Sequence, residues 1–174
     1  FVNKMDRRGA DFWRTVFMIK ERLGARPAVI QLPLGAEEGF RGVIDLLEGK
    51  AWIFSDELGA HPELVDIPGD YQDDLARYRE ALVESIVEFD DQLLATYLEG
   101  GEISPDELKR GLRQATLRGG LVPVLCGSAL RNKGIQPMLD AVIDYLPSPE
   151  DVPPVPGTDP RSGREIQRPP QDSA

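Results

Sequence analysis

The chain has 174 residues, of which 41% are hydrophobic and 29% charged, a composition typical of a globular protein with an apolar core. One cysteine and one histidine exclude a disulfide framework, a cysteine zinc cage and a histidine-rich metal site. The net charge of −10 argues against a nucleic-acid binder that works by neutralising phosphates. No apolar run reaches the length of a membrane span and no signal peptide opens the chain, so we expect no membrane contact and a cytoplasmic location.

The charge is unevenly distributed. Residues 55–108 hold sixteen acidic residues and only two basic ones, Arg77 and Arg79, whereas the remainder holds 18 basic and 14 acidic residues. On composition alone, such a block is most simply a solvated surface. It would also attract a basic protein surface and repel a phosphate backbone.

The first third of the chain predicts a strand end, a helix and a set of strands. Phe1-Val2 resembles the tail of a strand. Apolar residues at helical spacing over 9–23 predict a helix that Gly24 would end. Three segments then have the composition of strands, the last two joined as a hairpin: 27–34, 40–47 and 50–54.

The middle of the chain predicts a loop followed by helices. Residues 55–69 carry loop signals, and an amphipathic helical pattern extends over 70–98, with a break expected at Asp90-Asp91. Residues 104–107 read Ser-Pro-Asp-Glu, a capping box with proline at the first helical position, so the next helix begins there and ends near 118.

The last third of the chain predicts another strand and another helix. Residues 121–126 are apolar enough for a buried strand of a parallel sheet, and 134–146 have the apolar side of a helix. The outer parts therefore predict an α/β fold, part of a doubly wound sheet, in which ligands bind beyond the carboxyl ends of the strands. The roughly 90 additional residues between them suffice for an inserted subdomain. After 147, a proline-rich linker follows.

The tetrapeptide Asn3-Lys4-Met5-Asp6 fits the pattern N-K-x-D and follows the first strand end. An ionised Asp6 can accept hydrogen bonds from both the ring N–H and the exocyclic amino group of guanine, a donor pair that adenine lacks. Asn3 can bond the base and tie neighbouring loops, while the Lys4 stem can cover the ring system. By itself the tetrapeptide also fits an ordinary turn.

Gly127-Ser128-Ala129-Leu130 follows the second predicted strand end and favours base recognition over an ordinary turn at 3–6. A small residue such as Ala129 lets a backbone N–H approach the guanine carbonyl oxygen. The Ser128 hydroxyl can bond the Asp6 carboxylate. If both loops lie at one edge of the sheet, as the strands predict, Asp6 and Ala129 converge on one purine.

Longer segments resemble the bacterial-type translation elongation factor G family. They are NKMD with RRGADFWR, ERLGARPAVIQLPLG, GVIDLL, YLEG and GSALRNKGIQPMLDAVIDYLPSPEDVPP. This resemblance implies a GTP-binding domain of the P-loop GTPase type in 1–23 and 120–147, an inserted α+β subdomain in 24–119, and a linker with the start of a β-barrel domain in 148–174. It assigns guanine recognition to six positions: Asn3, Lys4, Asp6, Ser128, Ala129 and Leu130.

The resemblance also implies partners. A factor of this family is a ribosomal translocase that binds GTP and GDP, and its insert contacts the ribosomal stalk protein, for which the acidic block is suited. The phosphate-loop pattern G-x-x-x-x-G-K-S/T does not occur in the sequence. We therefore expect no GTP hydrolysis, no Mg²⁺ site and poor nucleotide affinity for the chain by itself, which we expect to be a monomer.

Two other interpretations stay open. The chain could belong to another translational GTPase, of the release-factor or ribosome-protection type, although YLEG and PSPEDVPP favour elongation factor G. It could also act as a non-catalytic protein-binding module centred on 24–119.

Overall fold

The structure is a computed structural model that describes residues 1–56 and 59–168. Its two central strands are parallel: β1 (Pro27–Val29) pairs with β6 (Val122–Val124). On the other edge of β6, Val2 forms a parallel bridge with Cys126 and its N–H donates to the carbonyl oxygen of Leu125 at 2.7 Å. The predicted strand end and the predicted strand over 121–126 therefore lie side by side.

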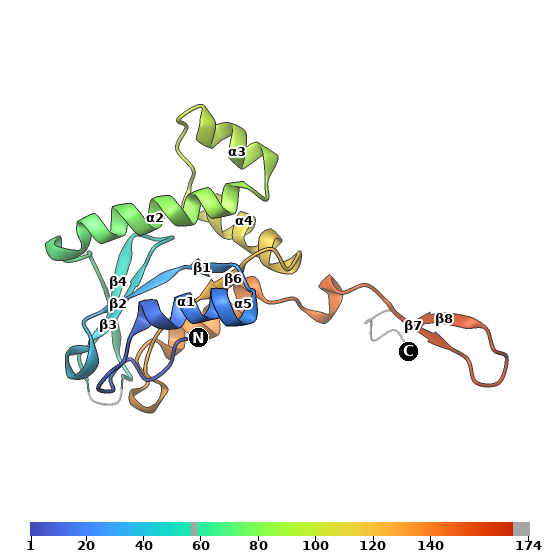
Figure 1. Cartoon of the computed structure of the whole chain (residues 1–174), viewed down its shortest axis with the longest axis horizontal. Helices are drawn as coiled ribbons and strands as arrows, with labels where there is room; N and C mark the ends of the chain where they lie inside the picture. The colour runs from blue at the N-terminus through green and yellow to red at the C-terminus, as the bar shows by residue number, and fades with distance from the viewer. Residues whose placement is uncertain (57–58, 169–174) are drawn as a thin grey trace.

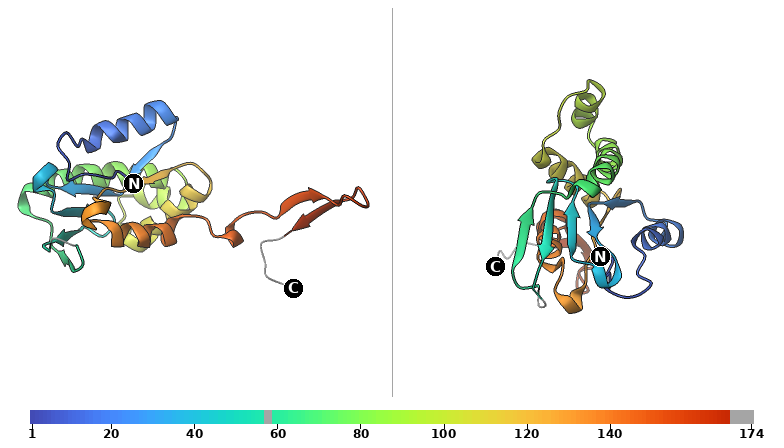
Figure 2. Two further views of the ribbon diagram at one scale, coloured as in Figure 1. Left: turned by 90° about the horizontal axis from the view of Figure 1, so that it is seen from below. Right: turned by 90° about the vertical axis from the view of Figure 1, so that its left-hand side faces the viewer.

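Helices cover both faces of this parallel pair. Helix α1 (Phe12–Leu23) and helix α5 (Ile135–Tyr145) lie on opposite sides of it (Figures 1 and 2). The predicted helix over 9–23 begins only at Phe12, because the Asp11 side chain accepts a hydrogen bond from the Arg14 N–H and caps the helix. Gly24 ends α1 in the left-handed conformation, as the sequence predicts.

The insertion contains an antiparallel sheet of four strands in the order β2-β3-β4-β5. The strands are β2 (Gln31–Leu34), β3 (Gly42–Asp45), β4 (Lys50–Phe54) and β5 (Pro62–Val65). The prediction of a loop throughout 55–69 is wrong, because β5 lies within it and pairs with β4. Pro62 is tolerated there as the first residue of a strand at the edge of the sheet.

One residue separates the two sheets. The predicted strand 27–34 is divided at Ile30, whose N–H donates to the Val124 carbonyl oxygen at 3.1 Å and whose carbonyl oxygen accepts from the Leu46 N–H at 3.0 Å. The part before Ile30 pairs with β6 and the part after it with β3. The segment 24–119, predicted as the insert, is thus hydrogen-bonded to the outer part at this point.

Three helices complete the insertion: α2 (Gln72–Val87), α3 (Asp91–Leu98) and α4 (Pro105–Leu117). The break predicted at Asp90-Asp91 is confirmed, since the Asp90 side chain accepts from the N–H groups of Gln92 and Leu93. The Ser104 capping box is confirmed as well. Figure 1 shows α2 extending along one end of the antiparallel strands, with α3 beyond it.

The apolar core is continuous across the sheets. It unites Val2 and Phe12 of the outer part with residues of both sheets and with Ile86 and Leu112 of the insertion helices, the last two fully buried. Helix α5 contributes Ala141 and Tyr145, whereas much of its predicted apolar side is exposed: Leu139, Val142, Ile143 and Leu146.

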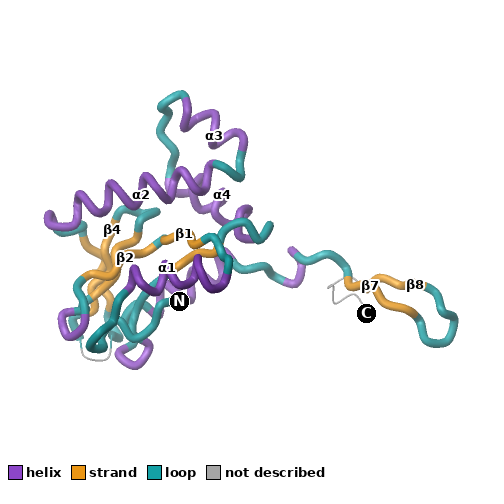
Figure 3. The backbone as a smooth tube through the Cα atoms, viewed as in Figure 1, coloured by secondary structure: helices purple, strands orange, loops and turns teal. Residues whose placement is uncertain are grey.

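The C-terminal part leaves this body. After the short helix η4 (Pro149–Asp151), strands β7 (Val155–Thr158) and β8 (Glu165–Arg168) form a hairpin that projects away (Figure 3). The sequence predicts a linker here and does not indicate the hairpin. Whether this segment starts a barrel domain stays a prediction. In the described part of the chain, no helix is long and apolar enough to cross a membrane.

Candidate functional site

The two predicted recognition loops meet at the carboxyl ends of the parallel strands. The Asn3 side-chain Oδ1 accepts from the Ala129 N–H at 3.0 Å and from the Lys4 N–H at 2.8 Å. The Met5 N–H donates to the Gly127 carbonyl oxygen at 3.1 Å. Residues that lie more than 120 positions apart in the sequence are thus joined by direct hydrogen bonds, and Asn3 ties the loops together as its chemistry suggests.

Asp6 and Ser128 form the second link between the loops. The hydrogen bond from the Ser128 hydroxyl is the main reason that the pKa of Asp6 lies below its ordinary value, and Arg7 and Arg131 lower this pKa further. Ser128 itself is buried, and its backbone exchanges hydrogen bonds with Lys133 at 2.9 and 3.0 Å. Asp6 therefore presents an ionised carboxylate, held from one side, to the solvent.

The remaining predicted residues lie at the surface beside this pair. Ala129 opens the short helix η3 (Ala129–Arg131), and its side chain is exposed, as are those of Lys4 and Leu130. Lys4 has φ +65°, a left-handed backbone that closes a turn in which the Arg7 N–H donates to the Lys4 carbonyl oxygen at 3.1 Å. The structure thus gathers all six predicted residues at one end of the parallel strands.

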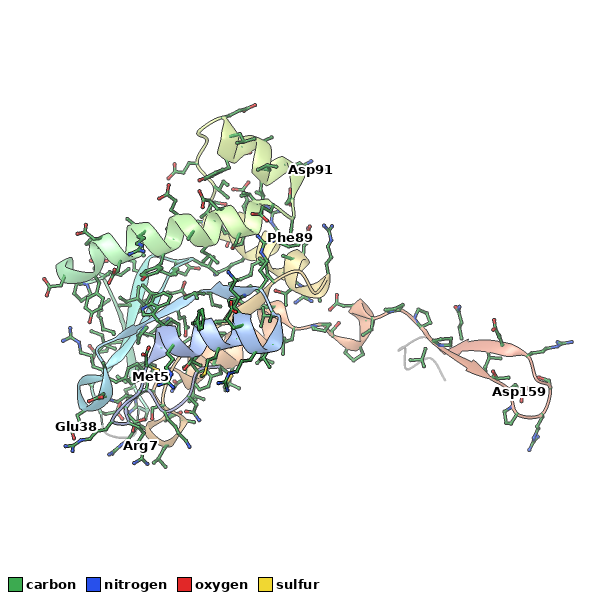
Figure 4. The ribbon with its side chains drawn as sticks, in the orientation of Figure 1. Met5, Arg7, Glu38, Phe89, Asp91 and Asp159 are labelled. Atoms are coloured by element: carbon green, nitrogen blue, oxygen red, sulfur yellow. The ribbon has the colours of Figure 1, made fainter. Side chains whose placement is uncertain are left out.

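A cavity of about 370 Å³ opens beside Asp6. Its walls come from both parts of the chain, with Arg131 and Lys133 on the loop that follows Ser128, and with Glu38 and Phe40 on the loop between β2 and β3. Figure 4 shows Met5, Arg7 and Glu38 at one end of the molecule, far from Asp91 at the start of α3. The insertion therefore contributes walls next to the recognition loops.

Two residues at the site, Glu37 and Lys133, are not identified as site residues from the sequence. The Glu37 N–H donates to the Met5 carbonyl oxygen at 3.1 Å, and one Glu37 carboxylate oxygen accepts from the Gly9 N–H at 2.7 Å. Lys133 donates from Nζ to the Phe40 carbonyl oxygen at 3.1 Å. No motif marks Glu37 in the sequence, because its partners are backbone groups remote along the chain.

Among the described residues, no three acidic, histidine or cysteine side chains form a group that could hold a metal ion. The thiol of Cys126 is fully buried, and burial raises its pKa. It therefore packs in the core as a small apolar side chain.

A parallel strand pair between helices, with polar loops at the carboxyl ends of its strands, defines the class of α/β nucleotide-binding domains. The family model of the elongation factor Tu GTP binding domain matches residues 1–148, so the chain belongs to that family. The chain is thereby placed among the GTP-binding domains of translational GTPases. The predicted fold class, a P-loop GTPase sheet interrupted by an α+β insertion, is confirmed.

A crystal structure of a protein from Thermus thermophilus is similar over 95% of this chain, with 30% sequence identity and a TM-score of 0.74. The chain spans 26% of the length of that protein. The likeness therefore includes the insertion as well as the parallel strands.

Proposed function

We propose that this chain is the guanine-recognising part of a translational GTPase of the elongation factor G type, a ribosomal translocase that acts in the cytoplasm. The observation that carries the proposal is the pair of links between the recognition loops, Asn3 to Ala129 and Ser128 to Asp6. The links leave an ionised carboxylate, an exposed small residue and an exposed lysine at one edge of the sheet.

These groups fit a guanine base. The Asp6 carboxylate can accept hydrogen bonds from the ring N–H and the exocyclic amino group together, and each charge-assisted bond contributes about 1.5–3 kcal/mol. Adenine would leave the carboxylate without these donors. The aliphatic stem of Lys4 can lie on the face of the base while its ammonium stays hydrated.

We assign base recognition, not hydrolysis, to these residues. The pattern that cradles phosphates in P-loop GTPases does not occur in the 174 residues. GTP or GDP, when bound, would bring its phosphates and the Mg²⁺ ion that they coordinate. The residues of this chain would select the base and orient it.

The insertion supplies the second part of the proposal. Helix α2 exposes Asp73, Asp74, Glu80 and Glu84 to solvent, within the acidic block. A surface of this sign would attract the basic face of a partner protein. We propose that it contacts the ribosomal stalk protein. A release-factor or ribosome-protection GTPase, or a non-catalytic binding module, remains the alternative.

The experiment compares binding of GDP and ADP at millimolar concentrations, followed by NMR at the amides of the Asn3–Asp6 loop. We expect GDP alone to shift these amides in a saturable way. Asp6→Asn should weaken GDP about tenfold or more, because it removes the charge from both bonds. The same substitution should improve binding of xanthosine diphosphate, because the carbonyl oxygen at C2 of xanthine can accept a hydrogen bond from the side-chain amide of the new asparagine.

The matched control is Asp140→Asn, the same change at an exposed residue of α5. It should leave GDP binding unaltered. Equal shifts with GDP and ADP in the unmodified chain would contradict guanine recognition and favour the binding-module alternative.

A further inference from the structure

The loop between β2 and β3 touches the recognition loop from the side of the insertion. Glu37 makes two hydrogen bonds there, from its N–H to the Met5 carbonyl oxygen at 3.1 Å and from the Gly9 N–H to its carboxylate at 2.7 Å. Met5 is 2% exposed, and its own N–H donates to Gly127. The backbone of Met5 is thus held on one side by the Ser128 loop and on the other by Glu37.

Glu37 adopts a backbone conformation that side chains disfavour. Its φ is +52°, in the left-handed region, where a residue other than glycine persists only if its surroundings hold it. The surroundings here are tight. The Phe40 N–H donates to the Glu37 carbonyl oxygen at 3.0 Å. At Gly35, φ is +85°, and a Cβ atom there would lie 2.1 Å from the Gly39 carbonyl oxygen.

The same loop is bonded to the start of the acidic helix. The Gly35 N–H donates to the Tyr71 hydroxyl at 3.1 Å, and Tyr71 directly precedes α2. Two hydrogen bonds, joined by the backbone from Gly35 to Glu37, therefore lead from Tyr71 at the beginning of α2 to Met5, the residue between Lys4 and Asp6. Strain at Glu37 lies at the point where the insertion meets the recognition loop.

We propose that Glu37 is a positioning residue for guanine recognition, which fixes the Asn3–Asp6 loop through Met5 and Gly9 without touching the base. The inference rests on the proposed guanine-binding function. Without the Glu37 carboxylate, the loop would keep its links to Gly127 and Ala129 and the backbone bond from Glu37 to Met5, but it would lose the bond at Gly9. Base selectivity would then decline, because the Asp6 carboxylate would no longer be oriented in advance.

Glu102 provides the control. It carries the same charge, is exposed in the loop between α3 and α4, and does not line the cavity beside Asp6. Glu38 is unsuitable, because it lines that cavity and its carboxylate pairs with Arg8 at 3.3 Å, directly before Gly9. Glu102→Ala therefore reproduces the change in charge without removing a bond to the recognition loop.

The test measures three quantities in the whole chain carrying Glu37→Ala, Glu37→Gln or Glu102→Ala: hydrogen exchange at the Gly9 amide, GDP affinity against ADP affinity by NMR, and the urea midpoint of unfolding. Glu37→Ala should raise the Gly9 exchange rate and lower GDP affinity, each about tenfold. Glu37→Gln, which keeps an acceptor oxygen, should restore most of both. Glu102→Ala should match the unmodified chain.

The outcomes separate the two proposals. If the unmodified chain binds GDP no better than ADP, the proposed function fails and the role of Glu37 fails with it. If GDP selectivity is present and Glu37→Ala retains it at the level of Glu102→Ala, only the role of Glu37 is overturned. A loss of affinity that follows the urea midpoint in every variant, with no rescue by Glu37→Gln, would show a merely structural role and overturn it too.

Discussion

The buried Ser128 is the main influence that lowers the pKa of Asp6. Because the Ser128 hydroxyl donates to Asp6, the charged form is favoured and the pKa of Asp6 is lowered. A carboxyl with a lowered pKa in the folded state adds stability above its unfolded pKa. This contribution is lost as the pH falls through the folded value. Ser128 thus extends the pH range over which Asp6 can accept hydrogen bonds.

We therefore expect Ser128→Ala to raise the pKa of Asp6 towards its ordinary value, as measured by NMR titration of its carboxyl carbon. The control is Ser162→Ala in the distant hairpin, where Ser162 donates to Asp159 at 2.7 Å and lowers the pKa of that carboxyl. Each substitution should raise the pKa of its own aspartate partner and leave the pKa of the other aspartate unchanged. An Asp6 titration that is the same in Ser128→Ala as in the unmodified chain would contradict the hydrogen bond between Ser128 and Asp6.

At this scale the sequence identifies the residues whose chemistry is local to a motif. Asn3, Asp6 and Ser128 carry recognisable side chains in recognisable loops, and the structure brings them together. That they bind guanine stays a prediction. Glu37 could not be found, because its two partners are a carbonyl oxygen and an N–H of residues about 30 positions away. Backbone groups leave no signature in a sequence.

Among the elements, α4 has the clearest start. The Ser104 hydroxyl accepts from the Glu107 N–H, and a Glu107 carboxylate oxygen accepts from the Ser104 N–H at 2.9 Å. These bonds satisfy N–H groups at the helix end that have no partner within the helix. Two buried leucines of α4, Leu108 and Leu112, then belong to the shared core.

Ser104→Ala should lower the free energy of unfolding by about 1 kcal/mol, measured by urea denaturation. Ser85→Ala in α2 is the comparison, since the Ser85 hydroxyl donates only to the Leu82 carbonyl oxygen inside its helix. Its effect should stay within about 0.5 kcal/mol. Equal effects of the two substitutions would mean that the capping box does not stabilise α4.

Elements with strong local signals can be predicted from the sequence, and those that depend on pairing cannot. The capping box and the aspartate break between α2 and α3 can be read from neighbouring residues. Strand β5 has only four residues and is defined by its pairing with β4. The division at Ile30 likewise depends on which strands lie alongside, and 27–34 alone gives no indication of two sheets.

At the scale of the whole molecule, part of the acidic block lies away from the basic side chains of the recognition loops. The recognition loops contain Lys4, Arg7 and Arg131. Acidic residues of the block lie on α2, α3 and α4, whereas Asp56 of the same block lines the cavity beside Asp6. Arg7 and Asp91, at the start of α3, lie well apart, as Figure 4 shows. A basic partner bound around Asp91 would therefore leave the Asp6 region accessible.

We expect the stalk protein to bind the chain more weakly as salt rises, because exposed charges are screened beyond about 10 Å at 0.1 M ionic strength. Asp73→Asn with Glu80→Gln removes two exposed charges one above the other on α2 and should weaken binding several-fold at low salt. Isothermal titration calorimetry would measure both effects.

The control for this prediction is Glu150→Gln with Glu165→Gln, which changes the net charge equally in the exposed C-terminal segment. It should leave the affinity nearly unchanged. Equal losses in both double variants would show that only overall charge matters, and binding indifferent to salt would contradict electrostatic docking.

The single residue between β1 and β2 gives the molecule mechanical continuity. Ile30 links the two strands covalently and is hydrogen-bonded to both Val124 and Leu46. The four-stranded sheet is therefore tied by backbone bonds to β6, and the chain leads on from β6 to Ser128. The orientation of the insertion is thus set directly against the strand that carries the Ser128 loop, with no linker between the two sheets.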